Sequence, residues 1–169
     1  FADKGTEKID KNKKKTSRKK SGGQGIGLNS KEIGAIDKQA MMVAENYYKE
    51  LGWKVTDKSG LYGGGRDLDC KKDGKTIHVE VKGTTSTNPS SIFLTHREVE
   101  RSRKDPSKSA LLIVSDIQWV QREKYICEGG TVTEIHPWEI NDNDLFAERY
   151  KYTLKWIPYE YLTHIWRKL

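Results

Sequence analysis

The sequence has little of what secreted and membrane proteins need. It contains two cysteines, Cys70 and Cys127, too few for a disulfide framework, and we interpret both as reduced packing residues. No apolar run approaches the roughly 18 residues of a membrane-spanning helix, and no apolar signal segment stands at the start. We therefore expect a cytoplasmic protein that does not associate with membranes.

The sequence is also poor in hydrophobic residues, which make up 34% of it. This low share predicts that part of the chain lies outside the packed core. The chain does not begin with methionine, so we expect a piece of a longer protein that is attached to further domains or subunits. Its 169 residues suit one domain of modest size with tails.

The positive charge is concentrated at one end of the chain. The formal net charge is +7, and residues 1–22 hold eight lysines, one arginine and three acids, so the remainder is nearly neutral. We interpret residues 1–29 as a basic, flexible leader or linker and residues 30–169 as the folded domain. The leader is either a solvated linker or a segment that attracts a polyanion such as DNA through salt-dependent contacts.

A helix is predicted from about residue 31 to residue 51, where Gly52 ends it. Ser30 is the expected N-cap. The apolar residues at helical spacing are Ile36, Ala40, Val43, Ala44, Tyr47 and Leu51, with Met41 and Tyr48 on one flank. Asp37 falls at the edge of this apolar face, whereas Glu45 falls roughly opposite its centre. Asp37 is therefore the better candidate for an acid that the helix presents to a site, although a surface role explains either acid equally simply.

The Asp73-Gly74 pair predicts a β-hairpin with arms at residues 66–71 and 75–82. Counting outward from the turn places Asp67 near the level of residues 80–82 on the neighbouring strand. Side chains of adjacent strands are close enough at that level to share a ligand.

The remaining elements follow from shorter patterns. We predict strands at residues 53–57, 92–94, 110–115, 124–127, 131–135 and 150–156, and helices at 95–104, 142–147 and 161–169. Thr95 and Glu98 have capping-box spacing and are best explained as the cap of their helix. This order predicts an α/β fold with a mixed β-sheet flanked by helices, and with additional C-terminal β-structure and a helix.

Strand alternation places His78, Glu80 and Lys82 on one face of the second hairpin arm. If that face meets bulk water, these residues are an ordinary solvated group, and His78 needs no role. If it lines a cleft, Asp67 and Glu80 can bind Mg²⁺ or Mn²⁺, with the Val81 backbone carbonyl as a third ligand. Lys82 would then orient a water molecule and neutralise developing negative charge.

The residues after Lys82 are candidates for contact with a phosphate. Gly83 would let a backbone pass close to a substrate, and the hydroxyls of Thr84 and Thr85 could donate to phosphate oxygens. These residues and the acids before them together form the predicted site.

This set of residues resembles the PD-(D/E)xK restriction-endonuclease-like superfamily, in which Gly-x-Asp-Leu is followed about a dozen residues later by Glu-x-Lys. A longer series is similar to the NO VEIN C-terminal domain family over residues 30–158. Its motifs are Ala40-Met41, Gly52-Trp53, Asp67-Leu68, Val79 to Thr85, Leu94-Thr95-x-x-Glu98-Val99, Leu111-x-Ile113-Val114-Ser115, Pro137-Trp138 and Tyr150-x-Tyr152.

The resemblance implies a restriction-endonuclease-like fold and a metal-dependent DNA endonuclease. Asp67, Glu80 and Lys82 would be catalytic, and a restriction or defence context is implied. One departure is that Asp37 stands where the superfamily usually has a longer helix glutamate. Two other functions are open: a catalytically silent nucleic-acid-binding module, and a protein-interaction domain of a larger protein. Cutting both strands of a duplex needs two active sites, so a homodimer is plausible.

Overall fold

The computed structural model describes residues 27–60 and 66–147 of the chain. The structure divides into two compact units after Glu139, and every element below belongs to the first unit except η3 (Asp142–Asp144). A short helix was predicted at that place, and a single 3₁₀ turn is found. The predicted strand at 150–156, the helix at 161–169 and residues 1–26 of the leader lie outside the described residues. In the described part, no helix is both long and apolar enough to cross a membrane.

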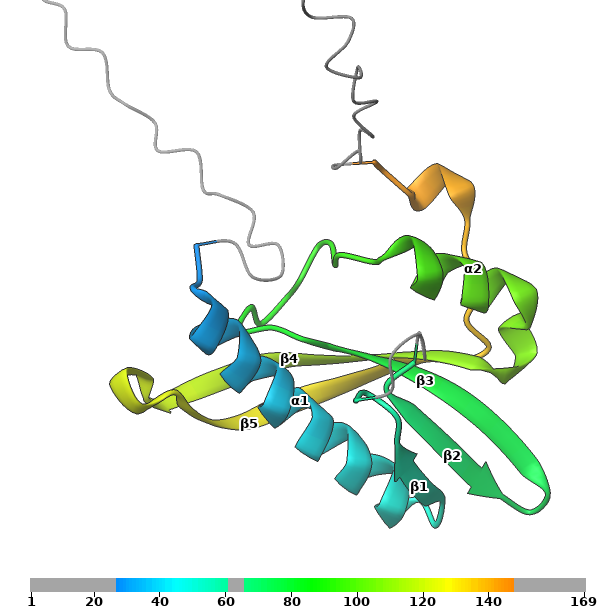
Figure 1. Cartoon of the computed structure of the whole chain (residues 1–169), viewed down its shortest axis with the longest axis horizontal. Coiled ribbons are helices and arrows are strands. Elements are labelled where there is room, and N and C mark those ends of the chain that lie inside the picture. Colours follow the sequence, from blue (N-terminus) through cyan, green and yellow to red (C-terminus); the bar gives the residue numbers. More distant parts are fainter. Residues whose placement is uncertain (1–26, 61–65, 148–169) are drawn as a thin grey trace, which may run out of the picture. The chain divides into compact units, whose positions relative to one another are not determined.

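The first unit is an α/β domain built on a five-stranded mixed sheet, as predicted (Figure 1). The strands lie in chain order: β1 (Lys54–Asp57), β2 (Leu68–Lys72), β3 (Lys75–Gly83), β4 (Ser109–Gln121) and β5 (Ile126–Ile135). Only β3 and β4 are parallel, and the other neighbours are antiparallel. The connection between the two parallel strands contains α2 (His96–Lys104) and the 3₁₀ turn η1 (Pro106–Lys108).

Helix α1 (Ser30–Glu50) packs across one face of this sheet (Figure 1). Its buried apolar side chains are Ile36, Ala40, Ala44 and Tyr48, which join a core with Leu68, Cys70, Ile77, Val79, Val81, Ala110, Leu112, Val114 and Ile117. These strand residues alternate along β2, β3 and β4, so the intervening residues face the other side of the sheet. Leu51 was predicted to belong to the apolar stripe, but it is exposed because it follows the last helical residue.

The ends of α1 differ slightly from the prediction. The N-cap is Asn29 rather than Ser30, because the Asn29 side chain accepts hydrogen bonds from the amides of Lys31 and Glu32. Glu32 completes a capping box by accepting from the Asn29 amide. Leu28 packs against the core, so these two residues at the end of the predicted leader belong structurally with α1. At the other end, Gly52 takes a left-handed backbone and stops the helix.

The β2–β3 hairpin has the predicted turn and register. Asp73 and Gly74 both have positive φ, as a two-residue turn of this type requires. Leu68 pairs with Val79, and the amide of Asp67 donates to the Val79 carbonyl. Asp67 therefore lies beside the charged end of β3, as the sequence indicated.

Three predicted strands were wrong in detail. Residues 92–94 form no strand, although Ile92 and Leu94 are half-buried. The predicted strands at 124–127 and 131–135 are parts of one strand, β5, and the turn lies earlier, at η2 (Arg122–Lys124).

The Gly129-Gly130 pair lies between the two strands predicted at 124–127 and 131–135, and in the structure it is part of β5. A Cβ on Gly130 would approach within 2.6 Å of Val114 Cγ1, so this glycine is needed for close packing and for its positive φ. The hairpin of β4 and β5 is consequently longer than predicted.

Gly83 provides a test of how closely α1 packs on β3. A Cβ on Gly83 would lie 2.8 Å from Ala40 Cβ and 3.1 Å from the Ile36 carbonyl oxygen. We expect Gly83→Ala to lower the free energy of unfolding by about 1–3 kcal/mol, because the helix would have to shift. In the matched control, Gly34→Ala, the added Cβ meets nothing within 4 Å and should stabilise α1 by about 0.5–1 kcal/mol. Denaturant unfolding of both variants measures this difference, and equal effects would contradict the close approach.

Candidate active site

All the predicted site residues except Thr84 and Thr85 line one cavity of about 460 Å³ beside the end of β3. Most of the lining is polar, and it comes from α1, β3, α2 and the segments before β2. The lining residues are Asp37, Lys38, Ala40, Met41, Ser59, Asp67, Glu80, Val81, Lys82, Gly83 and Glu98. The charged face of β3 therefore opens into a cleft.

Asp67 directly precedes the first residue of β2 and lies beside the part of β3 that continues beyond the β2–β3 ladder. The Asp67 backbone is fixed by two hydrogen bonds, from its amide to Val79 and from the Lys58 amide to its carbonyl. Its side-chain Oδ2 accepts from the Val81 amide at 2.8 Å, in the place where a longer β2 would pair. Within the described residues, Oδ1 of Asp67 has no hydrogen-bond partner, so this oxygen is available to a ligand.

The Val81 carbonyl lies on the same edge of β3 as Asp67. In an extended strand, the N–H and C=O groups of one residue point to the same side, and residues two apart repeat this direction. The Val79 carbonyl and the Val81 amide both face Asp67. The Val81 carbonyl therefore faces the same edge, consistent with the ligand role predicted for it.

Lys82 lies between two carboxylates. Its Nζ donates to Glu80 Oε1 at 2.6 Å and to Glu98 Oε2 at 2.9 Å. The three side chains are 8–13% exposed, so the group is shielded from water. Glu80 comes from β3 and Glu98 from the first turn of α2, so the lysine joins the helix to the sheet.

The balance of charge in the cavity is negative, and it shifts the pKa values of the acids. Burial has the largest effect on Glu80, and burial and the nearby Asp67 together raise its pKa to about 8 against the opposing effect of Lys82. Burial also raises the pKa of Asp67, although the Val81 amide and Lys82 oppose this. Glu98 differs: burial raises its pKa, but hydrogen bonds from Lys82 and from the Thr95 backbone outweigh burial and lower it.

The pKa of Lys82 lies above its ordinary value. Burial lowers it, but Glu80 and Glu98 favour the charged form more strongly. Lys82 is therefore an ammonium ion at neutral pH and acts as a donor and a positive charge.

The structure places Asp37, rather than Glu45, at the cavity, as the sequence predicted. Asp37 is an exposed residue, yet neighbouring protein atoms raise the pKa of its carboxyl while Lys82 opposes the rise. Glu45 instead forms an ion pair with Lys49 on the surface of α1. The helix acid therefore faces the site.

The three residues predicted to contact substrate have different surroundings. Gly83 lines the cavity, and α1 occupies the space where its Cβ would be. Thr84 is buried, and its hydroxyl accepts from the Ser86 amide, which gives it a structural role in the loop. Thr85 is exposed. Contact of these residues with a substrate stays a prediction.

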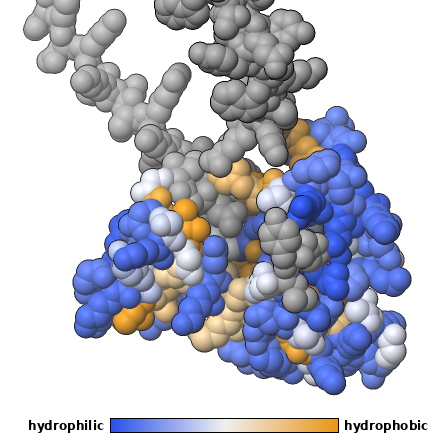
Figure 2. All heavy atoms as spheres, viewed as in Figure 1, coloured by the Kyte–Doolittle hydropathy of each residue, from blue (hydrophilic) through white to orange (hydrophobic). Residues whose placement is uncertain are grey.

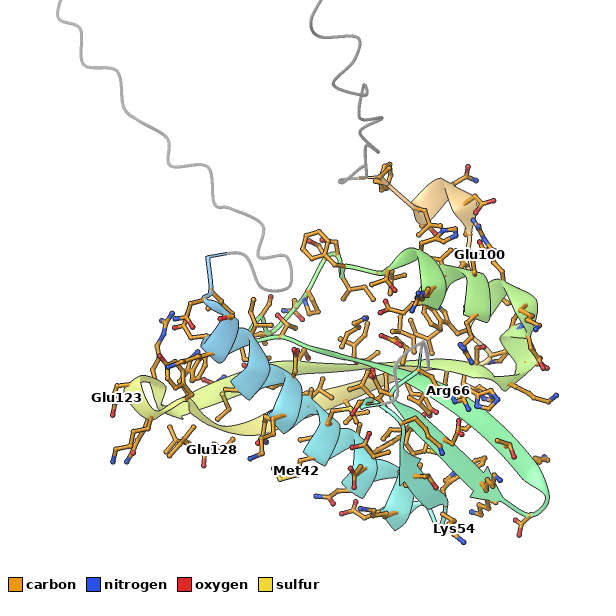
Figure 3. The ribbon with its side chains drawn as sticks, viewed as in Figure 1. Met42, Lys54, Arg66, Glu100, Glu123 and Glu128 are labelled. Atoms are coloured by element: carbon orange, nitrogen blue, oxygen red, sulfur yellow. The ribbon has the colours of Figure 1, made fainter. Side chains whose placement is uncertain are left out.

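His78 belongs to a separate ion-pair group next to the cavity. Asp69, one residue into β2, is buried and pairs with both Arg66 and His78. Figure 3 shows Arg66 near the start of β2. In this arrangement the His78 Nδ1 contacts Asp69 at 2.6 Å, so that nitrogen is engaged by a carboxylate.

The contact between Glu98 and Lys82 was missed in the sequence. The capping box predicted for Thr95 and Glu98 is present, and this role in capping α2 was the only one predicted for Glu98. The sequence did offer one signal of a further role: Glu98 belongs to one of the motifs that resemble the NO VEIN C-terminal domain family. Glu100, two residues later, lies on the exposed side of α2 and pairs with Arg103 (Figure 3).

The surface around these elements is mainly hydrophilic. In the view of Figure 2, polar side chains cover most of the described surface, and the hydrophobic patches between them are small. The buried apolar side chains lie instead between α1 and the sheet. The polar cavity is therefore the feature that distinguishes this region of the molecule.

The fold and the site define an α/β domain with a cleft of acids around one buried lysine. The profile of the family described as "Protein NO VEIN, C-terminal" matches residues 36–126, more than half of the chain. The chain therefore belongs to the NO VEIN C-terminal family. The matched segment is shorter than the predicted 30–158 and contains the whole cavity lining. Searches of curated proteins and of solved structures found no match.

The raised pKa of Glu80 predicts that the metal-free protein loses stability as the pH rises. The folded state binds the proton of Glu80 more tightly than the unfolded state, whose pKa is near 4.5. The stabilising contribution is complete below about pH 4.5 and disappears as the pH passes about 8. Its slope is at most about 1.4 kcal/mol per pH unit.

Glu80→Gln should remove this dependence because glutamine resembles the protonated acid. Urea unfolding in a chelating buffer at pH 5, 6, 7 and 8 measures the effect. We expect Glu80→Gln to become progressively more stable than the wild type over this range. Glu128→Gln, on an exposed position of β5 (Figure 3), is the matched control. A parallel decline in all three proteins would contradict the assignment to Glu80.

Proposed function

We propose that this domain is a metal-dependent endodeoxyribonuclease of the PD-(D/E)xK type. The observation that carries the proposal is that Asp67, Glu80 and Lys82 line one cavity, which supports phosphodiester hydrolysis as its chemistry. Lys82 pairs with Glu80 and is shielded from water, and Asp67, directly before β2, lines the same cavity.

The donor groups suit Mg²⁺, and Mn²⁺ in its place. Asp67 Oδ1 and the Val81 carbonyl are oxygen donors on one edge of β3, and the Glu80 carboxylate lines the same cavity. In residues 27–60 and 66–147, no three His, Cys, Asp or Glu side chains are grouped as a complete metal cage. Mg²⁺ usually binds through one or two carboxylates and keeps several waters, so two acids and a carbonyl fit it. When bound, such an ion would lower the pKa of a water and stabilise charge on a phosphate oxygen.

The other roles belong to the protein's own groups. Lys82 donates hydrogen bonds and places a positive charge beside Glu80, where it can orient a water molecule and stabilise a developing phosphate anion. Asp37 adds a carboxylate from α1 that can accept a proton from a water at the mouth of the cavity.

DNA is the proposed substrate, and the leader supplies affinity for it. Residues 1–22 carry nine basic residues against three acids, a polycation that attracts any nucleic-acid backbone. The resemblance to the NO VEIN C-terminal family implies a restriction or defence context, and such a context supports DNA as the substrate. Attachment to further domains and formation of a homodimer, which would supply two active sites, are parts of the same proposal.

Cleavage of supercoiled plasmid with Mg²⁺ or Mn²⁺ tests the nuclease. We expect Lys82→Ala to slow nicking by about 10²–10³-fold, because this variant removes the donor and the charge beside the reacting phosphate. Lys54→Ala is the matched control, since Lys54 is an exposed residue of β1 outside the cavity lining (Figure 3). The catalytic claim fails if the wild type and Lys82→Ala nick at the same slow rate with either metal.

The leader is tested separately by DNA binding. Replacing Lys13, Lys14, Lys15, Lys19 and Lys20 with glutamine in the full chain should weaken binding. The plot of log affinity against log salt should become shallower by about 0.9 for each DNA phosphate that the variant no longer neutralises. An unchanged slope would show that the leader is a solvated linker.

Binding measured beside cleavage also separates the other candidate functions. Salt-dependent binding without turnover identifies a catalytically silent nucleic-acid-binding module. If neither binding nor turnover is seen, the remaining candidate is a protein-interaction domain.

A further inference from the structure

We propose that Glu98 is a positioning residue for Lys82, held in place by the capping box of α2. This inference rests on the proposed function and adds to the site an acid from a third element. Its basis is geometric, because Glu98 makes a direct contact with the lysine and a second contact with the start of its own helix.

The contact with Lys82 is close and shielded. Lys82 Nζ lies 2.9 Å from Glu98 Oε2, and the Glu98 side chain is 13% exposed. The adjacent acid on α2 gives a useful comparison: Glu100 is 52% exposed and pairs along the helix with Arg103. Of these two acids, Glu98 in the first turn of α2 therefore reaches Lys82 of β3, whereas Glu100 does not.

The capping box fixes the orientation of Glu98. The Thr95 amide donates to Glu98 Oε2 at 2.9 Å, and the Glu98 amide donates to Thr95 Oγ1 at 3.3 Å. The oxygen that caps the helix is therefore the same oxygen that accepts from Lys82. Because the helix terminus restrains the carboxylate, holding the lysine costs little additional side-chain entropy.

A second carboxylate would be needed if Glu80 held a cation. The negative charge of Glu80 would then be shared with a dication, which would also repel the nearby ammonium group. Unit charges about 4 Å apart near a protein surface interact strongly enough to displace a lysine side chain. Glu98 lies on another element and keeps its charge beside Lys82, so the ammonium stays at the site.

Glu98→Gln separates the charge from the cap. Glutamine also completes a capping box, so this variant keeps the cap and removes the negative charge. Thr95→Ala does the reverse: it removes the hydroxyl and leaves both Glu98 and the amide of residue 95. Glu100→Gln is the matched control for the same chemical change on the same helix.

Two measurements on the full chain decide the role of Glu98. The first is plasmid nicking with Mn²⁺, with the maximal rate and the half-saturating DNA concentration determined separately. We expect Glu98→Gln to lower the maximal rate about 10–100-fold and to leave the half-saturating concentration within about twofold, the effect typical of a residue that orients another. Thr95→Ala and Glu100→Gln should keep wild-type rates at a temperature where all variants are folded.

The second measurement is the rate at which Lys82 is acetylated in metal-free protein, followed by mass spectrometry of its peptide. It does not require the protein to be a nuclease. We expect Lys82 to be modified several-fold faster in Glu98→Gln than in the wild type, Thr95→Ala or Glu100→Gln, because one of its two carboxylate partners is then uncharged.

The outcomes distinguish this inference from the proposed function. Wild-type nicking and wild-type acetylation in Glu98→Gln would overturn the positioning role. Equal reductions in Glu98→Gln and Thr95→Ala would also overturn it and assign Glu98 to the cap alone. If the wild type does not cut DNA, the proposed function fails, while the acetylation rates still show whether Glu98 holds Lys82.

Discussion

The hydrogen bond from the Val81 amide to the Asp67 side chain stands where the β2–β3 ladder ends and the cleft begins. β2 starts at Leu68, while β3 continues to Gly83. A longer β2 would pair with this part of β3 and leave no open edge. Because a carboxylate replaces the missing carbonyl, the Val81 amide stays satisfied while the edge remains open to a ligand. The cavity and the candidate metal donors depend on this substitution.

The cavity is an unfavourable arrangement for a folded protein. Asp37, Asp67, Glu80 and Glu98 line it together with Lys38 and Lys82, and burial has the largest effect on the pKa of each acid. Two carboxylates would suffice to neutralise the two lysines, and every further buried acid costs free energy unless it is protonated or meets a cation. Local arrangements that oppose stability are common at functional sites, and this excess of acids is what a cation-binding site requires.

The elements that were predicted correctly carry strong local patterns. α1 has a long helical period, the β2–β3 hairpin has an Asp-Gly turn, and α2 has a capping box. The hairpin register then places Asp67 beside the charged end of β3, so most of the site follows from local chemistry and simple geometry. The errors have equally physical origins. Residues 124–127 and 131–135 were predicted as separate strands, but the missing Cβ of Gly130 makes room for Val114 in a neighbouring strand, a contact that only the tertiary structure reveals.

Glu98 shows why one sufficient local explanation can conceal a second role. The capping pattern accounts for an acceptor at this position, so nothing further seemed to need explaining. A capping box, however, requires only a side-chain acceptor, and glutamine provides one as well as glutamate does. The negative charge is the property that the cap leaves unexplained, and the nearby group that uses it is the ammonium of Lys82. The same Glu98 oxygen caps α2 and accepts a hydrogen bond from Lys82 of β3, so the position of the helix start also determines the surroundings of the lysine.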